Sequence, residues 1–465
     1  MRSRLPRLLA GALFLALAAA WSSAAGATDA LFYREVERDG AIYVFTSPQG
    51  YQTWRDTSRL ANAIEKAGWG PSRETVVFED ESAVAIFEAR YGRPGPETPG
   101  EAAGDEAREE QRRRGGVFVG WKDGRTRFQS KDALLELRNR VEFRWTETMP
   151  DEGVRLSGTG AEGAGKGSFR IRRAKTELTG WFWRPELTYE LQLSWAGPEP
   201  GASTDTPLED LVLNWDFSGK RTGTLTFGQF KVPLGRQENT SSNKLQFCDR
   251  DILSTEFTRG RDVGVMLDGT IAKGRLDYAV GVFNGNPASR IENDNDKYQY
   301  NARLVFQPWG DVAYSEGDFE SKDHPLLALG AQFENNDLSN ATNATDYNTT
   351  IFGADLVFKF RGFSLFGEYF WREREPETGD AVDSNGFHVQ AGYFLKRDKI
   401  EIAFRYAAYD PSDAIAGNDR TEIGGALNYF IHGHNLKLQS DFRQLEDEAR
   451  GITNHELRIQ TYLVF

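Results

Sequence analysis

Basic side chains recur at every second position in several stretches of this sequence. Arg138 and Arg140 follow one another in this way, Arg144 shares their parity, and Arg173 and Lys175 repeat the spacing in a later stretch. Guanidinium groups bind the oxygens of an oxyanion through paired hydrogen bonds, whereas an ammonium group acts as a point charge. Such rows predict a surface that attracts anions.

Acidic side chains stand at the same spacing in the same stretches. Glu136, Glu142 and Glu177 share the parity of the basic residues around them. Opposite charges on neighbouring strands form ion pairs that support a sheet. The residues alone are compatible with two interpretations: a row of cations that binds anions, and cations that form ordinary ion pairs with acidic side chains of the same sheet.

Residues for enzymatic or metal chemistry are sparse. None of the five histidines stands beside a nucleophile or a carboxylate in a recognisable catalytic arrangement. The single cysteine, Cys248, excludes an intrachain disulfide. We therefore expect no enzyme activity, no metal site and no cofactor.

The charged rows belong to segments in which apolar and polar residues alternate strictly. Leu135, Leu137, Val141 and Phe143 share one parity, and the charged residues between them take the other. A period of two indicates a β-strand with one apolar face and one polar face. About sixteen such segments of about 9–15 residues follow from Ala133 onward, the length that a tilted strand needs to cross a bilayer.

These strands predict an all-β fold, a transmembrane antiparallel β-barrel of about 16 strands. A soluble sandwich also alternates, but its strands average only about 5–6 residues. In lipid, a closed barrel satisfies every backbone hydrogen bond, which an open sheet could not. Short turns such as 183–185 and 396–399 alternate with longer polar connections, and aromatic residues such as Trp309 and Tyr393 lie near strand ends, as expected of such a barrel.

The first 27 residues read as an export signal. Arg2, Arg4 and Arg7 precede an apolar run, Leu8–Ala20, that is too short for a membrane span, and small residues follow at 25–27. Their removal takes away three arginines and no acid, so the formal charge of -13 becomes about -16. This acidic balance argues against a nucleic-acid partner.

Between the signal and the barrel, the pattern predicts two further regions. Residues 28–92 mix strand patterns at 41–46 and 74–78 with a helix over 51–67, which predicts a small α/β module. Residues 93–127 form a linker rich in charge, proline and glycine, with too few apolar residues for a core. The barrel is predicted over 128–465.

One block of the barrel region carries a family resemblance. Residues 227–235 read FGQFKVPLG, residues 240–242 read TSS, and 260–269 read GRDVGVMLDG after Arg259. Together with FRIRRA at 169–174 and GVFNG at 281–285, this block resembles the phosphate-selective porin O and P family. The resemblance covers the barrel and not the N-terminal module.

The resemblance implies a sixteen-stranded homotrimeric porin in which a long loop folds inward and narrows the pore. The stretch 236–260, between strands that end near Lys231 and begin near Arg261, matches that loop. The candidate pore-lining and anion-binding residues combine this loop with the basic rows: Arg138, Arg140, Arg173, Lys175, Lys244, Arg250, Arg259 and Arg261. Asp249 within the loop departs from the family pattern, and its carboxylate, with those of Asp251 and Glu256, counts against an anion preference.

Two functions from different classes follow. The first is an outer-membrane porin for passive diffusion of small hydrophilic solutes, leaning to anions such as phosphate or polyphosphate, embedded in outer-membrane lipid with the N-terminal module in the periplasm. The alternative is a structural envelope anchor, whose module binds cell wall or a partner while the barrel serves as its mount.

Overall fold

The computed structural model divides the chain into two compact units, Met1–Arg114 and Gly115–Phe465. It describes residues 34–38, 41–57, 60, 63–69, 74–80, 83–84 and 87 of the first unit, and 117–122, 124–151, 166–196, 207–285, 293, 295–338 and 347–465 of the second. The predicted signal peptide and the charged run of the linker lie outside these ranges. Within them, no helix has the length and apolar character needed to cross a membrane.

The N-terminal unit contains the predicted small α/β module. Its elements are β1 (Arg34–Arg38), β2 (Ala41–Phe45), α2 (Pro48–Thr57), β3 (Ile64–Lys66) and β4 (Thr75–Phe78), with sheet order β1-β2-β4-β3. Val44, Val76 and Phe78 form its core, and Ile64 packs against that core. The helix predicted over 51–67 is therefore shorter than expected, because Ile64 reaches the core from a strand paired with β4.

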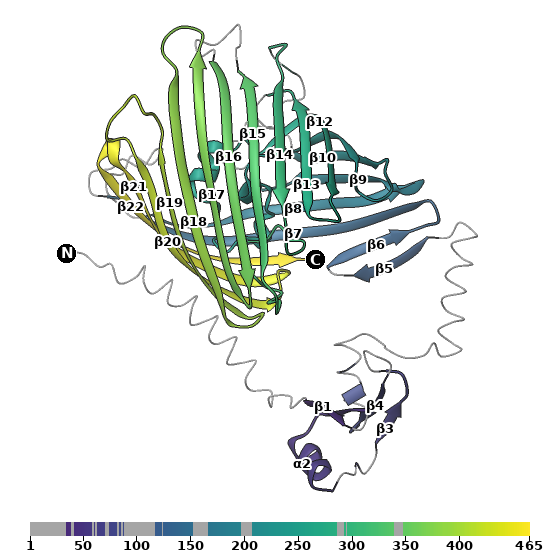
Figure 1. Ribbon diagram of the computed structural model, residues 1–465. Coiled ribbons are helices and arrows are strands. Elements are labelled where there is room, and N and C mark those ends of the chain that lie inside the picture. Colours follow the sequence, from purple (N-terminus) through teal and green to yellow (C-terminus); the bar gives the residue numbers. More distant parts are fainter. Residues whose placement is uncertain are drawn as a thin grey trace, which may run out of the picture. The chain divides into compact units, whose positions relative to one another are not determined.

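Sixteen antiparallel strands close into the predicted barrel (Figure 1). They are β7 (Ala133–Met149), β8 (Lys166–Phe182), β9 (Arg184–Ser194), β10 (Leu208–Asp216), β11 (Thr224–Lys231), β12 (Arg261–Ile271), β13 (Leu276–Phe283), β14 (Gln299–Phe306), β15 (Leu326–Asp337), β16 (Tyr347–Phe360), β17 (Phe363–Pro376), β18 (Val382–Lys396), β19 (Ile400–Asp410), β20 (Arg420–His432), β21 (Leu436–Asp447) and β22 (Ile452–Val464). The last strand pairs with the first over Val464↔Arg140 to His455↔Met149, which closes the sheet. A short turn of helix, η2 (Glu448–Arg450), precedes β22, and further short helices lie between β11 and β12.

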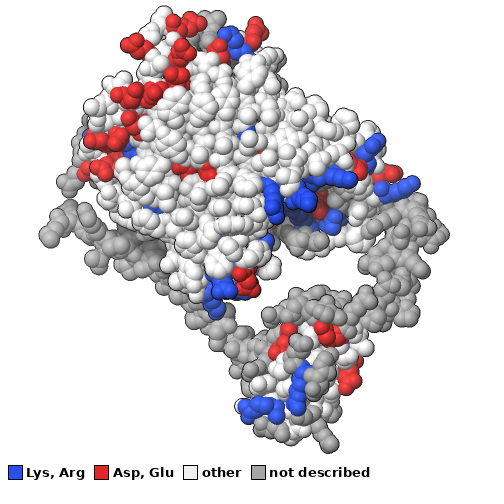
Figure 2. Space-filling model, viewed as in Figure 1, with Lys and Arg blue, Asp and Glu red and all other residues white. Residues whose placement is uncertain are grey.

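The two parities of each strand face different surroundings, as the alternation predicts. On β19, Ile402 and Phe404 are exposed on the outer wall, whereas Arg405 between Phe404 and Tyr406 is fully buried inside. The outer wall of the barrel is largely uncharged in the view of Figure 2, and acidic side chains gather over one end of the strands. Lipid therefore meets the apolar parity, and the charged parity faces the lumen.

A short hairpin precedes the barrel, where the sequence predicted the end of the linker. Its strands are β5 (Phe118–Lys122) and β6 (Arg125–Gln129), and β6 pairs with the first residues of β7, Leu134–Leu137. Val119 and Trp121 are exposed on its outer face. On the other face Arg125 and Arg127 form ion pairs with Glu136 at 3.0 and 2.7 Å. The hairpin thus continues the alternation of the barrel wall.

Two truncations should separate the hairpin from the module. A chain that starts at Gly115 should insert and conduct like the full chain, because it keeps β6 beside β7. A chain that starts at Ser130 leaves the β7 backbone over 134–137 without its partner, and unpaired backbone groups in lipid cost several kcal/mol each. It should lose its folded gel migration at a lower temperature than the Gly115 chain.

Equal melting of the two truncated chains would show that the hairpin adds nothing to the barrel. Failure of the Gly115 chain to assemble in vesicles, under conditions where the full chain succeeds, would show that the N-terminal module is part of the barrel fold.

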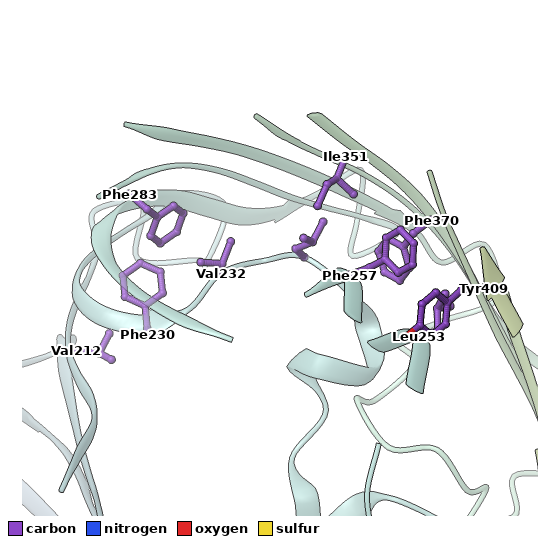
Figure 3. Close-up of a cluster of buried hydrophobic side chains, with 10 residues drawn as sticks. Val212, Phe230, Val232, Leu253, Phe257, Phe283, Ile351, Phe370 and Tyr409 are labelled. Carbon is purple, nitrogen blue, oxygen red and sulfur yellow. The ribbon is translucent and has the colours of Figure 1, made fainter. Parts of the chain in front are cut away.

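The segment 232–260, here the constriction segment, folds into the barrel as the resemblance implied. It contains α5 (Arg236–Asn239), η1 (Ser242–Lys244) and α6 (Ile252–Phe257). Figure 3 shows Val232, Leu253 and Phe257 of this segment against wall residues that include Phe370 and Tyr409. Burial of each such side chain contributes about 1.5–3 kcal/mol. The packing therefore fixes the constriction segment against the wall.

A second segment, residues 307–325 between β14 and β15, also packs inside the barrel and was not anticipated. It comes from the end of the barrel where the other described turns are short, such as 361–362 and 397–399. Val312 is buried with Val305 and Phe366, and the ring of Phe319 lies 5.3 Å from that of Phe430. We name it the second inward segment.

Candidate functional site

Basic residues of β7 and β8 line an open cavity of about 1550 Å³ beside the constriction segment. The register places Arg140 opposite Lys175 and Arg138 opposite Glu177, so these side chains share the inward face. Arg140 donates to Ser241 Oγ of the constriction segment at 3.2 Å. The two rows of cations found in the sequence therefore form one wall of the cavity.

A β-bulge in β8 adds a further arginine to this wall. The register shifts between Glu142↔Arg173 and Phe143↔Ile171, so Arg172 is the extra residue. Its guanidinium lines the cavity together with that of Arg173. A prediction from strict alternation does not place Arg172 on the inward face. The sequence nevertheless indicates the bulge, because the outward residues Ile171 and Ala174 are three positions apart, whereas Phe169 and Ile171 are two positions apart.

The guanidinium groups at the bulge converge on Asp249 of the constriction segment. Arg172 and Arg173 contact Oδ1 at 3.2 and 3.4 Å, and Arg458 of β22 contacts Oδ2 at 3.3 Å. Arg144 of β7 also pairs with this carboxylate and donates to the Cys248 carbonyl at 2.8 Å. Burial alone would raise the pKa of the Asp249 carboxyl, but the four guanidinium groups hold it well below its ordinary value. Asp249 is therefore ionised.

Carboxylates on β9 and β10 face the basic wall. Lys175 pairs with Glu209 at 2.6 Å, and Arg261 holds Asp210 through two nitrogens at 2.8 and 2.7 Å. Within the basic wall itself, Arg138 pairs with Glu177 of β8 through one nitrogen, Nη2. The cations therefore form the cross-strand ion pairs that one interpretation expected, and they also line the cavity, whereas anion binding by them stays a prediction.

The candidate residues of the constriction segment differ in their placement. Arg250 lines the cavity while its guanidinium is held by Glu238 at 3.0 Å and by the Gln237 carbonyl. Arg259 also lines the cavity. Lys244 is not among the lining residues, because η1 turns toward the second inward segment, where the Lys244 carbonyl accepts from Glu316 N at 3.1 Å.

Of the eight candidates, seven line the cavity: Arg138, Arg140, Arg173, Lys175, Arg250, Arg259 and Arg261. Arg172, Lys231 and Arg420 line it as well and were not singled out from the sequence. Arg303, Arg405 and Lys437 face inward elsewhere; Arg303 pairs with Asp355 at 2.6 Å and Arg405 with Glu422 at 3.3 Å. Among the described residues, no group of histidine, cysteine and acidic side chains is arranged to hold a metal ion.

A match to a sequence model of a known protein family shows which family this chain belongs to. The model for the phosphate-selective porin O and P family matches residues 154–464, more than half of the chain. The chain belongs to this family. It is an outer-membrane porin, and the resemblance seen in the sequence is confirmed.

Solved structures agree with this fold. The anion-selective porin from Comamonas acidovorans superposes with a TM-score of 0.52 at 11% identity, over 72% of this chain and 100% of that chain. The outer membrane channel DcaP of Acinetobacter baumannii superposes with a TM-score of 0.50 at 12% identity, over 75% and 100%. At these identities the likeness concerns the barrel fold. No curated protein sequence matches the chain.

Proposed function

We propose that this porin passes small anions by passive diffusion, with a preference for phosphate and related oxyanions. The observation that carries the proposal is the basic wall of the cavity, where Arg138, Arg140, Arg172, Arg173 and Lys175 stand together on β7 and β8. Fixed charges in a narrow lumen set the sign of ion selectivity, and guanidinium forks suit phosphate oxygens. The porin from Comamonas acidovorans is anion-selective, which is consistent with this proposal.

The facing carboxylates limit this preference but do not cancel it. Glu177, Glu190, Glu209 and Asp210 reduce the net positive charge of the cavity. Ion pairs of this kind hold the arginines in fixed positions, so that an entering anion meets oriented donors at no further cost in side-chain freedom. The proposal therefore expects moderate anion selectivity rather than exclusion of cations.

Planar bilayers test the sign of selectivity. In a potassium chloride gradient, the reversal potential should show that chloride passes more readily than potassium, because the cavity wall is basic. Inorganic phosphate added to the bath should reduce the chloride current, because it occupies the same guanidinium groups. If potassium is preferred and phosphate leaves the current unchanged, the chain is a porin without this substrate preference.

The proposal includes the placement of the remaining parts of the chain. A signal peptide over 1–27 is removed on export, the module over 28–92 lies in the periplasm, and a linker leads from it to the hairpin before the barrel. The barrels assemble as a homotrimer. Support comes from the shared end of the barrel at which β7 begins and β22 ends, since short turns and both termini of such barrels lie on the periplasmic side. Digestion of intact cells by added protease should leave the module uncut.

A further inference from the structure

A group of buried oxygen atoms lies on the inner wall of the barrel, outside the cavity. Gln299 and Asn301 of β14 and Asn336 of β15 are 0%, 2% and 1% exposed. Their amide oxygens take part in no hydrogen bond within the described part of the chain, and neither does the hydroxyl of Thr349 on β16. Buried polar atoms of this kind are rare in folded proteins and mark positions where an ion or a ligand can bind. None of the four residues lines the cavity.

The register of the sheet brings these side chains together. Gln299 lies opposite Asn336, and Asn336 lies opposite Thr349, so the three stand side by side across β14, β15 and β16. Asn301 is two residues from Gln299 and lies opposite Glu334. Side chains in opposite positions of antiparallel strands are neighbours on one face of a sheet. We name these five residues the oxygen patch.

Glu334 adds a carboxylate to the oxygen patch. It is 1% exposed, and its Oε2 accepts from Gln299 Nε2 at 2.7 Å and from Asn301 Nδ2 at 3.3 Å. Among the described residues, no lysine, arginine or histidine forms an ion pair with it, and Arg259 acts on its charge only from beyond ion-pair range. A buried carboxylate without a paired cation is strongly unfavourable. The oxygen patch therefore lacks a positive charge.

A metal cation compensates the oxygen patch better than a proton or a water molecule does. A proton on Glu334 would remove the charge, but it could be donated to only one of the other oxygens. Water would donate hydrogen bonds and leave the carboxylate charge in place. Hard cations bind carboxylates and the amide oxygens of asparagine and glutamine. Calcium accepts about 6–8 oxygens in a flexible arrangement, whereas magnesium demands a near-ideal octahedron.

We propose that the oxygen patch binds a calcium ion. Glu334 supplies the negative charge, and the amides of Gln299, Asn301 and Asn336 supply neutral oxygens. This site goes beyond the proposed function, because it does not depend on which solute the pore passes. The sequence does not indicate it, since polar residues from three strands have no spacing that distinguishes them from other lumen residues.

The calcium ion connects the end of the constriction segment to the barrel wall. Asn336 Nδ2 donates to the Gly285 carbonyl at 3.1 Å, and Gly285 N donates to Asp262 Oδ2 at 2.7 Å. Asp262 directly follows Arg261, the residue at which the chain enters β12 from the constriction segment. A Cβ on Gly285 would lie 2.3 Å from Asn336 Oδ1, so glycine is required for this close approach. By fixing Asn336, the ion stabilises this junction.

Calcium binding by the full-length chain tests the proposal. The chain is refolded in detergent without lipopolysaccharide, stripped of metal with EGTA and dialysed against radioactive calcium chloride. We expect one tightly bound calcium ion per chain. The folded gel migration should also persist to a higher temperature in calcium than in EGTA, because a ligand that binds only the folded state stabilises it.

Two variants of the oxygen patch should weaken binding to different degrees. Glu334→Gln keeps the shape of the side chain and removes its charge. Because ligand charge sets the affinity for calcium, the affinity should fall by about tenfold or more, and the calcium-dependent rise in unfolding temperature should disappear. Asn301→Leu keeps the carboxylate, removes one amide oxygen and should weaken binding by a smaller factor. It carries the test should Glu334→Gln not fold.

The matched control is Glu375→Gln. Glu375 is exposed on β17 opposite Asn348, the neighbour of Thr349, so this change removes a carboxylate at the same end of the barrel without touching the oxygen patch. Its calcium affinity and its unfolding temperature in calcium should match those of the unmodified chain.

Three results would overturn the inference. An unmodified chain that binds no calcium would show that Arg259 or a proton compensates Glu334. Unchanged binding in Glu334→Gln would place the calcium elsewhere, and equal losses in Glu334→Gln and Glu375→Gln would assign it to exposed acids. Each result leaves the proposed anion preference standing, because that preference is measured separately by reversal potentials.

Discussion

Removal of the second inward segment should raise the single-channel conductance by about twofold or more, because the current through a pore follows its open cross-section. The variant replaces residues 309–323 by Asn-Gly and keeps both strands that the segment joins. The segment contacts inward residues of β17, β18 and β20, namely Phe366, Gln390 and Phe430, so its removal should open a second path beside the cavity. The measurement is the distribution of single-channel current steps in planar bilayers.

The hydrogen bonds of Glu316 hold the second inward segment in place inside the barrel. Its carboxylate accepts from Gln237 Nε2 at 2.8 Å, from Gln246 N at 2.6 Å and from Gln390 Nε2 of β18 at 2.8 Å. The guanidinium of Arg236 donates to the Val312 carbonyl at 2.8 Å and lies 4.3 Å from the Tyr314 ring centre. The two inward segments are therefore bound to each other and to the wall.

Shortening of the exposed connection 377–381 between β17 and β18 is the matched control, because it lies outside the barrel and should leave the conductance unchanged. Glu316→Ala removes three of the hydrogen bonds and should give a smaller or intermittent increase. Current steps of unchanged size in the variant that lacks residues 309–323 would show that the second inward segment does not obstruct conduction.

The sequence predicts the barrel well because its wall obeys one rule. Each strand between lipid and lumen must alternate, so the sixteen strands and the inward parity of Arg140 or Glu142 follow from the spacing alone. The inward placement of the constriction segment is different. It came from a family resemblance, since nothing in the spacing of residues 236–260 indicates on which side of the wall they pack.

Three features escaped the sequence for separate physical reasons. The hairpin strands β5 and β6 are too short for periodicity to stand out from a charged linker. The bulge at Arg172 interrupts the alternation by one residue and thereby adds a cation to the lumen. The second inward segment mixes half-buried aromatic residues such as Phe319 with buried acids such as Glu316, a composition that fits neither a strand nor a solvated loop. Only the length of this connection could have indicated an unusual structure, because it has 19 residues at the end of the barrel where the other described connections are short turns.

Neutralisation of the basic wall should change the sign of the ion selectivity. The variant Arg138→Gln, Arg140→Gln and Lys175→Gln removes three cations from β7 and β8 and keeps side chains of similar length. Glu177 and Glu209 then lose their shorter ion pairs and keep only those with Arg125 and Arg261, each at 3.4 Å, so carboxylates dominate this part of the cavity. Because fixed charges in the lumen set selectivity, the ratio of anion to cation permeability should fall by about tenfold or more. Reversal potentials in a potassium chloride gradient measure this ratio.

The control variant changes the same net charge at a different place. Arg361 and Arg397 lie in exposed turns, Lys396 is the exposed last residue of β18, and none of the three lines the cavity, so their replacement by glutamine should alter the ratio far less. The wall variant should also melt at a lower temperature, since the nearly buried Glu177 carboxylate loses its pairs with Arg138 and Arg140 and keeps only the pair with Arg125 at 3.4 Å, and loss of partners destabilises a buried charge. A wall variant that remains folded and retains the original reversal potential would show that these three cations are ion-pair partners within the wall, and that the selectivity of the pore is set elsewhere.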